Sequence, residues 1–291
     1  MDSKKKNILV TGAAGQLGLS LRKIAPDYPS FGFLFTDMPE GDITDRARIE
    51  RIVRENEIEV IVNCAAYTAV DRAESDEDTA RQINAQGPRT LAEIARDQGL
   101  ALVHVSTDYV FPGTGNTPLS ETDLPDPLSA YGRTKLEGEK AVEASGCDAA
   151  IVRTAWLYSE FGNNFVKTML RVGKERGAVN VVYDQTGTPT YATSLARAIL
   201  KIVQNGIKGF DLYHYTDEGV TSWYDFAQSI FALYGLDVTV NAIRTREYPT
   251  PATRPVYSVL SKTKAKMAGI DTPYWRDALK SCITLLKQTE K

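Results

Sequence analysis

The sequence predicts an α/β protein, with a Rossmann-type doubly wound parallel sheet and a smaller C-terminal α/β lobe. A short apolar run near the N-terminus is followed directly by three evenly spaced glycines and a helical pattern. Strand and helix signals then alternate through the first half of the chain, which is typical of parallel strands joined by crossover helices. After about Asp184 the pattern changes to short strands, helices and Pro-rich turns, which indicates a lobe that closes over the strand ends.

The first strand and the turn after it carry the clearest signal. Residues 8–10 form an apolar run that a central parallel strand would bury on both faces. The glycine-rich turn leads into a helix, so backbone N–H groups and a positive dipole end point outward. Because glycine has no Cβ, a diphosphate can approach this backbone closely. The turn predicts a dinucleotide site, and a glycine-rich turn without a ligand is the alternative. The cofactor-binding residues expected here are Gly12, Gly15, Gln16 and Leu17.

The second predicted strand, residues 31–36, ends at an acidic residue. Asp37 would accept hydrogen bonds from the adenosine ribose hydroxyls, and its charge would repel a 2′-phosphate, which favours NAD(H). A solvated loop aspartate is the alternative. Residues 42–45 then cap a helix. In many folds of this type an aspartate at this point lies near the adenine, so Asp42 and Ile43 are included in the cofactor site.

The third predicted strand begins at Val60 and runs into small residues at its carboxyl end. Such ends line the ligand crevice of open α/β sheets, so we expect Ala65, Ala66 and Tyr67 beside the cofactor. A long helical pattern follows from residue 75 and closes at Gly99. Asn84 lies inside it, where a polar side chain usually faces solvent.

A fourth strand is predicted over residues 101–105, followed by the hydroxyl-rich run 106–111. His104 lies within the apolar run, which favours a core histidine with satisfied hydrogen bonds over a catalyst. An irregular, Pro-rich loop leads to a helix over 128–140. Later elements are strands over 149–153 and 179–182, with a helix over 163–176 between them.

Composition excludes several classes of protein. The 291 residues carry a net charge of −3, which gives no electrostatic footprint for nucleic acid. No apolar stretch has the length of a membrane span, so no membrane partner is expected, and the cytoplasm is the expected location. The 3 cysteines are widely spaced and predict neither disulfides nor a zinc site. The 2 histidines exclude a multi-histidine metal centre.

Tyr131 and Lys135 are the candidate catalytic pair. They are four residues apart in a predicted helix, so their side chains lie on the same face. A neighbouring ammonium favours phenolate, which would draw the tyrosine pKa down from about 10 and suit a proton donor to an alkoxide. Ser106 and Thr107 could supply a hydroxyl that polarises a carbonyl. A solvated Tyr/Lys helix face is the alternative.

These motifs together resemble a known superfamily. Gly12-x-x-Gly15-x-x-Gly18, Ser106/Thr107 and Tyr131-x-x-x-Lys135, in this order, resemble the extended short-chain dehydrogenases/reductases. Within them, the chain is similar to the dTDP-4-dehydrorhamnose reductase family. That resemblance rests on segments 11–18, 63–74, 106–111, 131–139, 153–156 and 184–190, and on 221–226 and 251–255.

The resemblance implies a reaction and a site. NADH or NADPH would deliver hydride to C4 of dTDP-4-dehydro-L-rhamnose, giving dTDP-L-rhamnose. Tyr131 would protonate the oxyanion, Lys135 would tune it and hold the nicotinamide ribose, and Thr107 would hydrogen-bond the carbonyl. The positions that match substrate contacts are Thr68, Val70, Thr107, Asp108, Tyr109 and Trp156, with Arg254 for an anionic group or, alternatively, in a surface salt bridge. It also implies a dinucleotide-binding domain over 1–183, with room for later returns of the chain, and a mainly sugar-nucleotide-binding lobe over 184–291.

One departure concerns metal and assembly. Some family members form a magnesium-bridged dimer through a glutamate just after the glycine turn, and Ser20 stands at the matching position. Serine is no carboxylate ligand for a hard cation, so we predict no metal and a monomer or weak homodimer. A related sugar-nucleotide epimerase or dehydratase, and a non-catalytic regulatory homologue, are the alternative functions. The choice between NADH and NADPH stays open.

Overall fold

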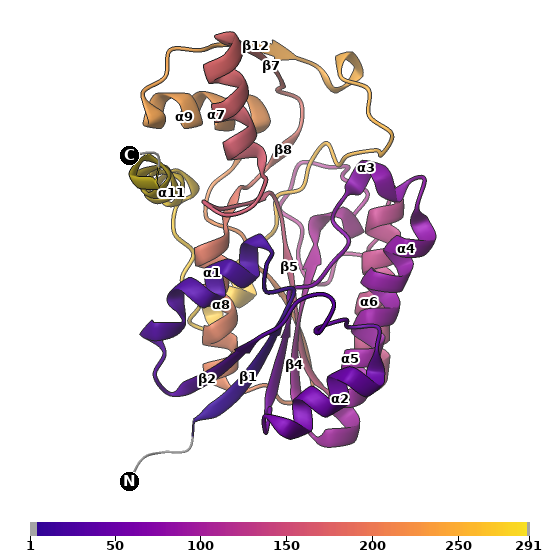
Figure 1. The fold of residues 1–291 in the computed structure, drawn as a ribbon. Helices are drawn as coiled ribbons and strands as arrows, with labels where there is room; N and C mark the ends of the chain where they lie inside the picture. Colours follow the sequence, from indigo (N-terminus) through magenta and orange to yellow (C-terminus); the bar gives the residue numbers. More distant parts are fainter. Residues whose placement is uncertain (1–4, 290–291) are drawn as a thin grey trace.

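The computed structural model describes residues 5–289 and contains a central six-stranded parallel sheet (Figure 1). The strand order is β10-β5-β4-β3-β1-β2. The order reverses between β1 and β3, so their carboxyl ends border the crevice where open α/β sheets bind ligands. The predicted doubly wound fold is confirmed. The strands are β1 (Lys6–Thr11), β2 (Phe31–Phe35), β3 (Val60–Asn63), β4 (Ala101–Thr107), β5 (Asp148–Thr154) and β10 (Phe210–His214).

Helices cover both faces of this sheet (Figure 1). On one face lie α1 (Gln16–Ile24) and α8 (Ala192–Asn205); on the other lie α2 (Arg46–Glu55), α5 (Gly87–Gln98) and α6 (Ala130–Ser145). Side chains of β1 alternate between these layers. Ile8 and Val10 pack with the α1/α8 layer, and Leu9 packs with the opposite layer. This alternation explains why the strand reads as a continuous apolar run.

A smaller lobe lies beyond the carboxyl ends of the strands, at the top of Figure 1. It contains α7 (Phe165–Arg176), β7 (Ala178–Val182), α9 (Trp223–Tyr234), β12 (Thr239–Ile243) and α11 (Trp275–Thr289). Its core is aromatic, and Phe226 contacts the rings of Tyr158, Phe165 and Trp275. The remaining short elements are α3 (Val70–Ala73), α4 (Glu77–Arg81), β6 (Leu157–Tyr158), β8 (Thr186–Gly187), β9 (Thr190–Tyr191), β11 (Thr221–Ser222) and α10 (Thr263–Met267).

The structure places the strand predicted over 179–182 outside the central sheet. β7 pairs with β12 in a separate two-stranded sheet. The sixth place in the central sheet belongs to β10, which pairs in parallel with β5 after the chain has returned through α8. The predicted division at residue 183 left room for such a return, and that boundary stays a prediction.

The helix predicted from residue 75 onward is interrupted. It consists of α4, a π-helical segment (Gln82–Gln86) and α5, which ends at Gly99 with φ +67°. Asn84 lies in the π-helical segment and is 0% exposed, so the expectation that it faces solvent is wrong. Its amide accepts from the N–H of Tyr67 and donates to the carbonyl of Tyr67, at 2.9 and 3.1 Å. Asn84 therefore fixes the backbone just after β3.

Between residues 5 and 289, no helix combines the length and apolar character that crossing a bilayer requires.

Candidate active site

The glycine turn after β1 is packed too tightly for side chains. Gly12 has φ +65°, and a Cβ there would lie 2.5 Å from the backbone nitrogen of Ala65. A Cβ on Gly18 would lie 2.5 Å from Ala13 Cα. Gly15 is the N-cap of α1 and provides no side-chain acceptor for the first N–H groups of that helix. The glycine turn is thus a cradle packed against the end of β3, and the first turn of α1, which has no side-chain cap, faces an anion site.

The structure separates the roles of Gln16 and Leu17. Leu17 is 5% exposed and belongs to the core beneath α1. Gln16 Oε1 accepts from Ser159 Oγ at 3.0 Å and from Asn164 Nδ2 at 2.9 Å. Its side chain therefore joins α1 to the segment before α7. The backbone of these two residues forms the start of α1, and its contact with the cofactor stays a prediction.

Asp37 lies just beyond β2 and contacts the glycine turn. Its Oδ2 accepts from the N–H of Ala14 at 2.6 Å, and its Oδ1 accepts from the N–H of Met38 at 2.8 Å. The carboxylate thus braces the turn, a role that the sequence did not reveal. Its expected contact with the adenosine ribose stays a prediction.

The other expected cofactor residues lie around the same edge. Asp42 Oδ1 accepts from the N–H and hydroxyl of Thr44 at 2.9 and 2.7 Å, which forms a turn before α2. Ile43 is 3% exposed and packs closely on Gly87. A Cβ on Gly87 would lie 2.4 Å from Cδ1 of Ile43. Ala65 and Ala66 are half-buried beyond β3. The phenol of Tyr67 donates to Asp76 Oδ2 at 3.2 Å.

Tyr131 and Thr107 meet at the carboxyl end of β4. The rings of Tyr131 and Tyr109 form an edge-to-face pair with centroids 5.5 Å apart. Burial raises the pKa of Tyr131 to about 12, and its hydrogen bond with Thr107 opposes this shift. Thr107 Oγ1 also donates to Asp108 Oδ1 at 3.0 Å. Burial raises the pKa of Asp108 to about 6.

Lys135 lies one turn further along α6 and is 2% exposed. Its Nζ donates to the carbonyl of Val105 at 2.7 Å. Burial lowers the pKa of Lys135 to about 8. The expectation that Lys135 draws the pKa of Tyr131 below its usual value is wrong in this structure, because burial dominates and Lys135 is not among the groups that shift that pKa.

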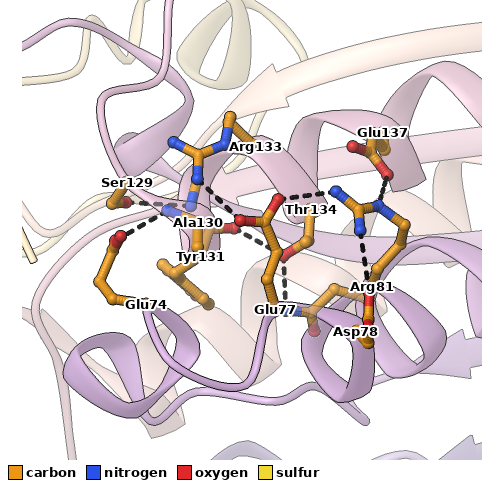
Figure 2. Close-up of polar contacts among 12 residues, drawn as sticks. Glu74, Glu77, Asp78, Arg81, Ser129, Ala130, Tyr131, Arg133, Thr134 and Glu137 are labelled. Atoms are coloured by element: carbon orange, nitrogen blue, oxygen red, sulfur yellow. Dashed lines mark hydrogen bonds and ion pairs between the residues drawn. The ribbon is translucent and has the colours of Figure 1, made fainter.

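The N-terminal turn of α6 is fixed from both sides (Figure 2). Ser129 Oγ accepts from the N–H of Gly132 at 3.1 Å. Glu74 Oε1, from the turn between α3 and α4, accepts from the N–H of Ala130 at 2.8 Å. The Glu74 carboxylate and the Ser129 hydroxyl thus accept from backbone N–H groups that the start of a helix otherwise leaves unpaired. Together they fix the start of the helix at the residue before Tyr131.

A cavity of about 290 Å³ lies beside Tyr109 and extends into the smaller lobe. Arg254 on its wall makes a bidentate ion pair with Asp71, with Nη1–Oδ1 at 3.0 Å and Nη2–Oδ2 at 2.8 Å. The salt bridge expected as the alternative for Arg254 is present, and its contact with an anionic group stays a prediction. The cavity is lined by Tyr109, Phe165, Thr168, Met169, Asn180, Val181, Val182, Gln185, Trp223, Tyr248, Thr250 and Arg254.

Trp156 does not line this cavity but supports it. Its ring stacks on Trp223 with centroids 3.6 Å apart and planes 11° apart, and its backbone has φ +48°. Thr68 is exposed and Val70 is half-buried at the start of α3, the helix that carries Asp71. The sequence singled out segment 221–226 but not Trp223 itself, since its position depends on how α9 packs over the sheet.

Comparison with known proteins identifies the family. The family model described as "RmlD substrate binding domain" matches residues 6–288. The chain is 43% identical over 286 residues to dTDP-4-dehydrorhamnose reductase of Aggregatibacter actinomycetemcomitans, covering 94% of this chain and 97% of that protein. The chain belongs to the dTDP-4-dehydrorhamnose reductase family.

Solved structures of this family agree with the fold. A dTDP-4-dehydrorhamnose reductase from Clostridium acetobutylicum is 45% identical, with a TM-score of 0.91 and coverage of 97% of this chain and 99% of that one. The reductase from Bacillus anthracis, solved in complex with NADP, is 37% identical with a TM-score of 0.92 and the same coverage. The resemblance predicted from the motifs is confirmed over nearly the whole chain.

Ser20, which the sequence analysis singled out for the question of a bridging metal, lies on the buried face of α1. It is 0% exposed, and its hydroxyl donates to the carbonyl of Gln16 at 2.8 Å. In the part of the chain that the structure describes, no three His, Cys, Asp or Glu side chains gather in a way that could hold a metal ion. The absence of a metal and the state of assembly stay predictions.

Proposed function

We propose that this protein reduces the C4 ketone of dTDP-4-dehydro-L-rhamnose to dTDP-L-rhamnose with NADH or NADPH. The observation that carries the proposal is the position of Tyr131. Its phenol lies with Thr107 at the carboxyl end of β4, the strand next to β3. Its ring packs edge-to-face on Tyr109, which lines the 290 Å³ cavity. Family membership over nearly the full length supports the same reaction.

The cradle fits a reduced dinucleotide. The first turn of α1, which has no side-chain cap, suits a diphosphate. Asp37 adds a negative charge near the cradle, which favours NAD(H), whereas the Bacillus anthracis relative was solved with NADP. Bound there, the nicotinamide would supply the hydride that C4 receives.

The protein supplies the proton. With a pKa of about 12, Tyr131 holds its proton at neutral pH, so it can donate that proton when hydride transfer begins. As negative charge develops on the C4 oxygen, Tyr131 gives up that proton to it, and Thr107 hydrogen-bonds the same oxygen. Lys135, one turn along α6, would hold the nicotinamide ribose. We assign Tyr131, Thr107 and Lys135 these roles.

The cavity suits a nucleoside diphosphate sugar. Arg254 offers a planar guanidinium to a diphosphate, and Asp71 holds that guanidinium in place. Trp223 and Tyr248 offer aromatic surface to a pyrimidine base. Thr68, Val70, Asp108 and Tyr109 would contact the sugar, with Trp156 acting through Trp223.

Tyr131→Phe tests the assignment of the proton donor. With dTDP-4-dehydro-L-rhamnose, we expect kcat to fall by roughly 10²–10⁴-fold, because the general acid is lost while the ring remains. Loss of nicotinamide absorbance measures turnover with each cofactor, and fluorescence titration measures cofactor binding, which we expect to be unchanged. Tyr28→Phe, in a tyrosine that packs below α8, is the matched control.

Other results would contradict the proposal. An unchanged rate in Tyr131→Phe would remove Tyr131 as the acid. Conversion of the sugar nucleotide without net loss of the reduced cofactor would indicate an epimerase or dehydratase instead. No turnover of any 4-keto sugar nucleotide by the folded wild-type protein, with the cofactor bound, would favour a regulatory homologue.

A further inference from the structure

A chain of buried polar side chains crosses the sheet and ends at Lys135. Thr11 on β1 donates to Asn63 Oδ1 on β3 at 2.8 Å. Asn63 Nδ2 lies 3.0 Å from His104 Nδ1 on β4. His104 Nε2 lies 3.4 Å from Lys135 Nζ on α6. All four residues are at most 2% exposed, so no bulk water competes for these contacts.

The orientation of the Asn63 amide follows from the backbone. The N–H of Ala65 can only donate, and it points to one end of the amide at 3.1 Å. That end must therefore be Oδ1, which also accepts from Thr11. The other end, Nδ2, can only donate. His104 Nδ1 must accept this hydrogen bond, so it carries no proton.

A neutral histidine with a bare Nδ1 carries its proton on Nε2. We propose that His104 is a positioning residue for Lys135. Asn63 fixes His104 as the Nε2–H tautomer, and the Nε2 proton faces Lys135 Nζ. Burial and the neighbouring Lys135 charge keep the pKa of His104 well below 6.5, so the ring is neutral at neutral pH. The N–H of Ala65 orients the Asn63 amide, and that orientation in turn decides that His104 carries its proton on Nε2.

The contact between His104 and Lys135 favours the neutral amine form of the lysine. An N–H that faces Nζ suits the lone pair of an amine and opposes the ammonium form, as burial also does. Nζ is meanwhile held by the carbonyl of Val105 at 2.7 Å. The charge of Glu139, on the same helix, opposes the lowering of the Lys135 pKa. Glu139 is itself paired with Arg153 at 2.7 Å. His104 therefore limits where Nζ lies between β4 and α6.

His214 provides an internal comparison, because the chain has only 2 histidines. His214 Nδ1 lies 3.1 Å from the carbonyl of Leu119, which can only accept. Its Nε2 lies 3.4 Å from Arg153 Nη1, which can only donate. His214 is therefore expected as the Nδ1–H tautomer, the opposite of His104.

Nitrogen NMR tests the proposal without reference to activity. The full-length protein, with both histidines ¹⁵N-labelled, is measured by long-range ¹H–¹⁵N correlation at pH 7. We expect two neutral rings, one Nε2–H and one Nδ1–H. His214→Gln, or His104→Gln if the first does not fold, assigns the Nε2–H ring to His104. An Nδ1–H or doubly protonated His104 would overturn the proposal.

Kinetics test the effect on Lys135, and this part rests on the proposed reductase function. We expect His104→Leu to lower kcat by roughly 10- to 100-fold with KM for the sugar nucleotide unchanged, because Nζ is misplaced. His104→Gln, which keeps an N–H near the position of Nε2, restores most of the loss. His214→Leu, an equally buried control, keeps kcat. Unchanged kcat in His104→Leu, or an equal loss in His214→Leu, refutes the positioning role. If the wild-type protein turns over no sugar nucleotide, the reductase assignment fails while the NMR result still decides the tautomer.

Discussion

Lys135 shows how a side chain with a proposed catalytic role is kept at a cost to the stability of the fold. It is 2% exposed and has one oxygen acceptor within reach, the carbonyl of Val105. A buried ammonium with so few partners is disfavoured relative to water. For this reason burial lowers the pKa of Lys135 from 10.5 to about 8. Folding is therefore weakened by this residue whenever the lysine is charged.

Lys135→Met should separate activity from stability. We expect turnover to be lost, and the free energy of unfolding at pH 7 to rise by on the order of 3 kcal/mol, because the buried charge is removed. The folded pKa of about 8 lies below the unfolded value of 10.5. The penalty in the wild type is thus fully present below pH 8 and fades as the pH rises toward about 10.5.

Urea unfolding of both proteins at pH 7 and pH 10 checks this expectation. The stability gap should be large at pH 7 and smaller at pH 10. Lys140→Met, in an exposed lysine of the same helix, is the control and should leave stability almost unchanged. A destabilised Lys135→Met protein would mean that the Val105 contact outweighs the cost of burying the charge.

Single residues also mark the limit of prediction from the sequence. The glycines, Tyr131 and Lys135 could be found because the spacing of each motif is local and carries its own geometry. The expected pKa of Tyr131 was wrong because burial, to which packing on Tyr109 contributes, outweighs any effect of the lysine four residues away. Asn84 was misjudged for the same reason. Its three hydrogen-bonding contacts come from Tyr67 and Thr134, which lie 17 and 50 residues away.

At the scale of elements, α6 begins where one local and one distant acceptor meet it. Ser129 is the local N-cap, which a sequence can show. Glu74, by contrast, lies 56 residues before Ala130. Further ion pairs join α4 to α6, from Glu77 to Arg133 at 2.9 Å and from Arg81 to Glu137 at 2.9 Å (Figure 2). The α3–α4 segment therefore fixes the helix that carries the proposed catalytic pair.

Glu74→Ala should misplace Tyr131. We expect stability to fall by about 1 kcal/mol, as for loss of a helix cap, and kcat to fall by roughly 10-fold with little change in KM. Glu74→Gln keeps the acceptor oxygen and should retain most of kcat. Steady-state kinetics and urea unfolding measure the two effects. Equal losses in Glu74→Gln and Glu74→Ala would show that the charge matters and the hydrogen bond does not.

The pairing of β7 and β10 shows what the sequence pattern could not predict about the strands. Periodicity predicted that residues 179–182 form a strand, and β7 confirms it. Periodicity could not say that β7 pairs with β12 rather than with β5, since this depends on where α7 places the chain. The strand that takes that place, β10, is only partly buried and begins with the exposed Phe210. Its apolar pattern is correspondingly weak.

At the scale of the whole molecule, the Arg254–Asp71 pair joins the two parts of the site. It connects residues 183 positions apart, and Asp71 Oδ1 also accepts from the N–H of Ala252 at 3.2 Å. The side-chain hydrogen bond of Arg254 lowers the pKa of Asp71. The loop at 250–255 is thus held to α3, and through Glu74 and α4 to the start of α6. The cavity and α6 share one connected framework of hydrogen bonds and ion pairs.

Arg254→Gln and Asp71→Asn test whether this framework aims the guanidinium at the substrate. We expect Arg254→Gln to raise KM for the sugar nucleotide by roughly 10- to 100-fold, since a charge-assisted hydrogen bond to phosphate is lost. Asp71→Asn should raise KM by less, roughly 3- to 10-fold, because Arg254 remains but must be ordered on binding. Steady-state kinetics on both variants and on the double variant measure the coupling.

The double variant decides between positioning and competition. If Asp71 acts only by holding Arg254, the double variant has the KM of Arg254→Gln alone, and the two effects are not additive. Additive effects would mean that Asp71 contacts the substrate by itself. A lower KM in Asp71→Asn would mean that the carboxylate competes with the diphosphate for Arg254. Arg171→Gln, in an exposed ion pair with Glu175 on α7, is the control for general loss of charge and should leave KM unchanged.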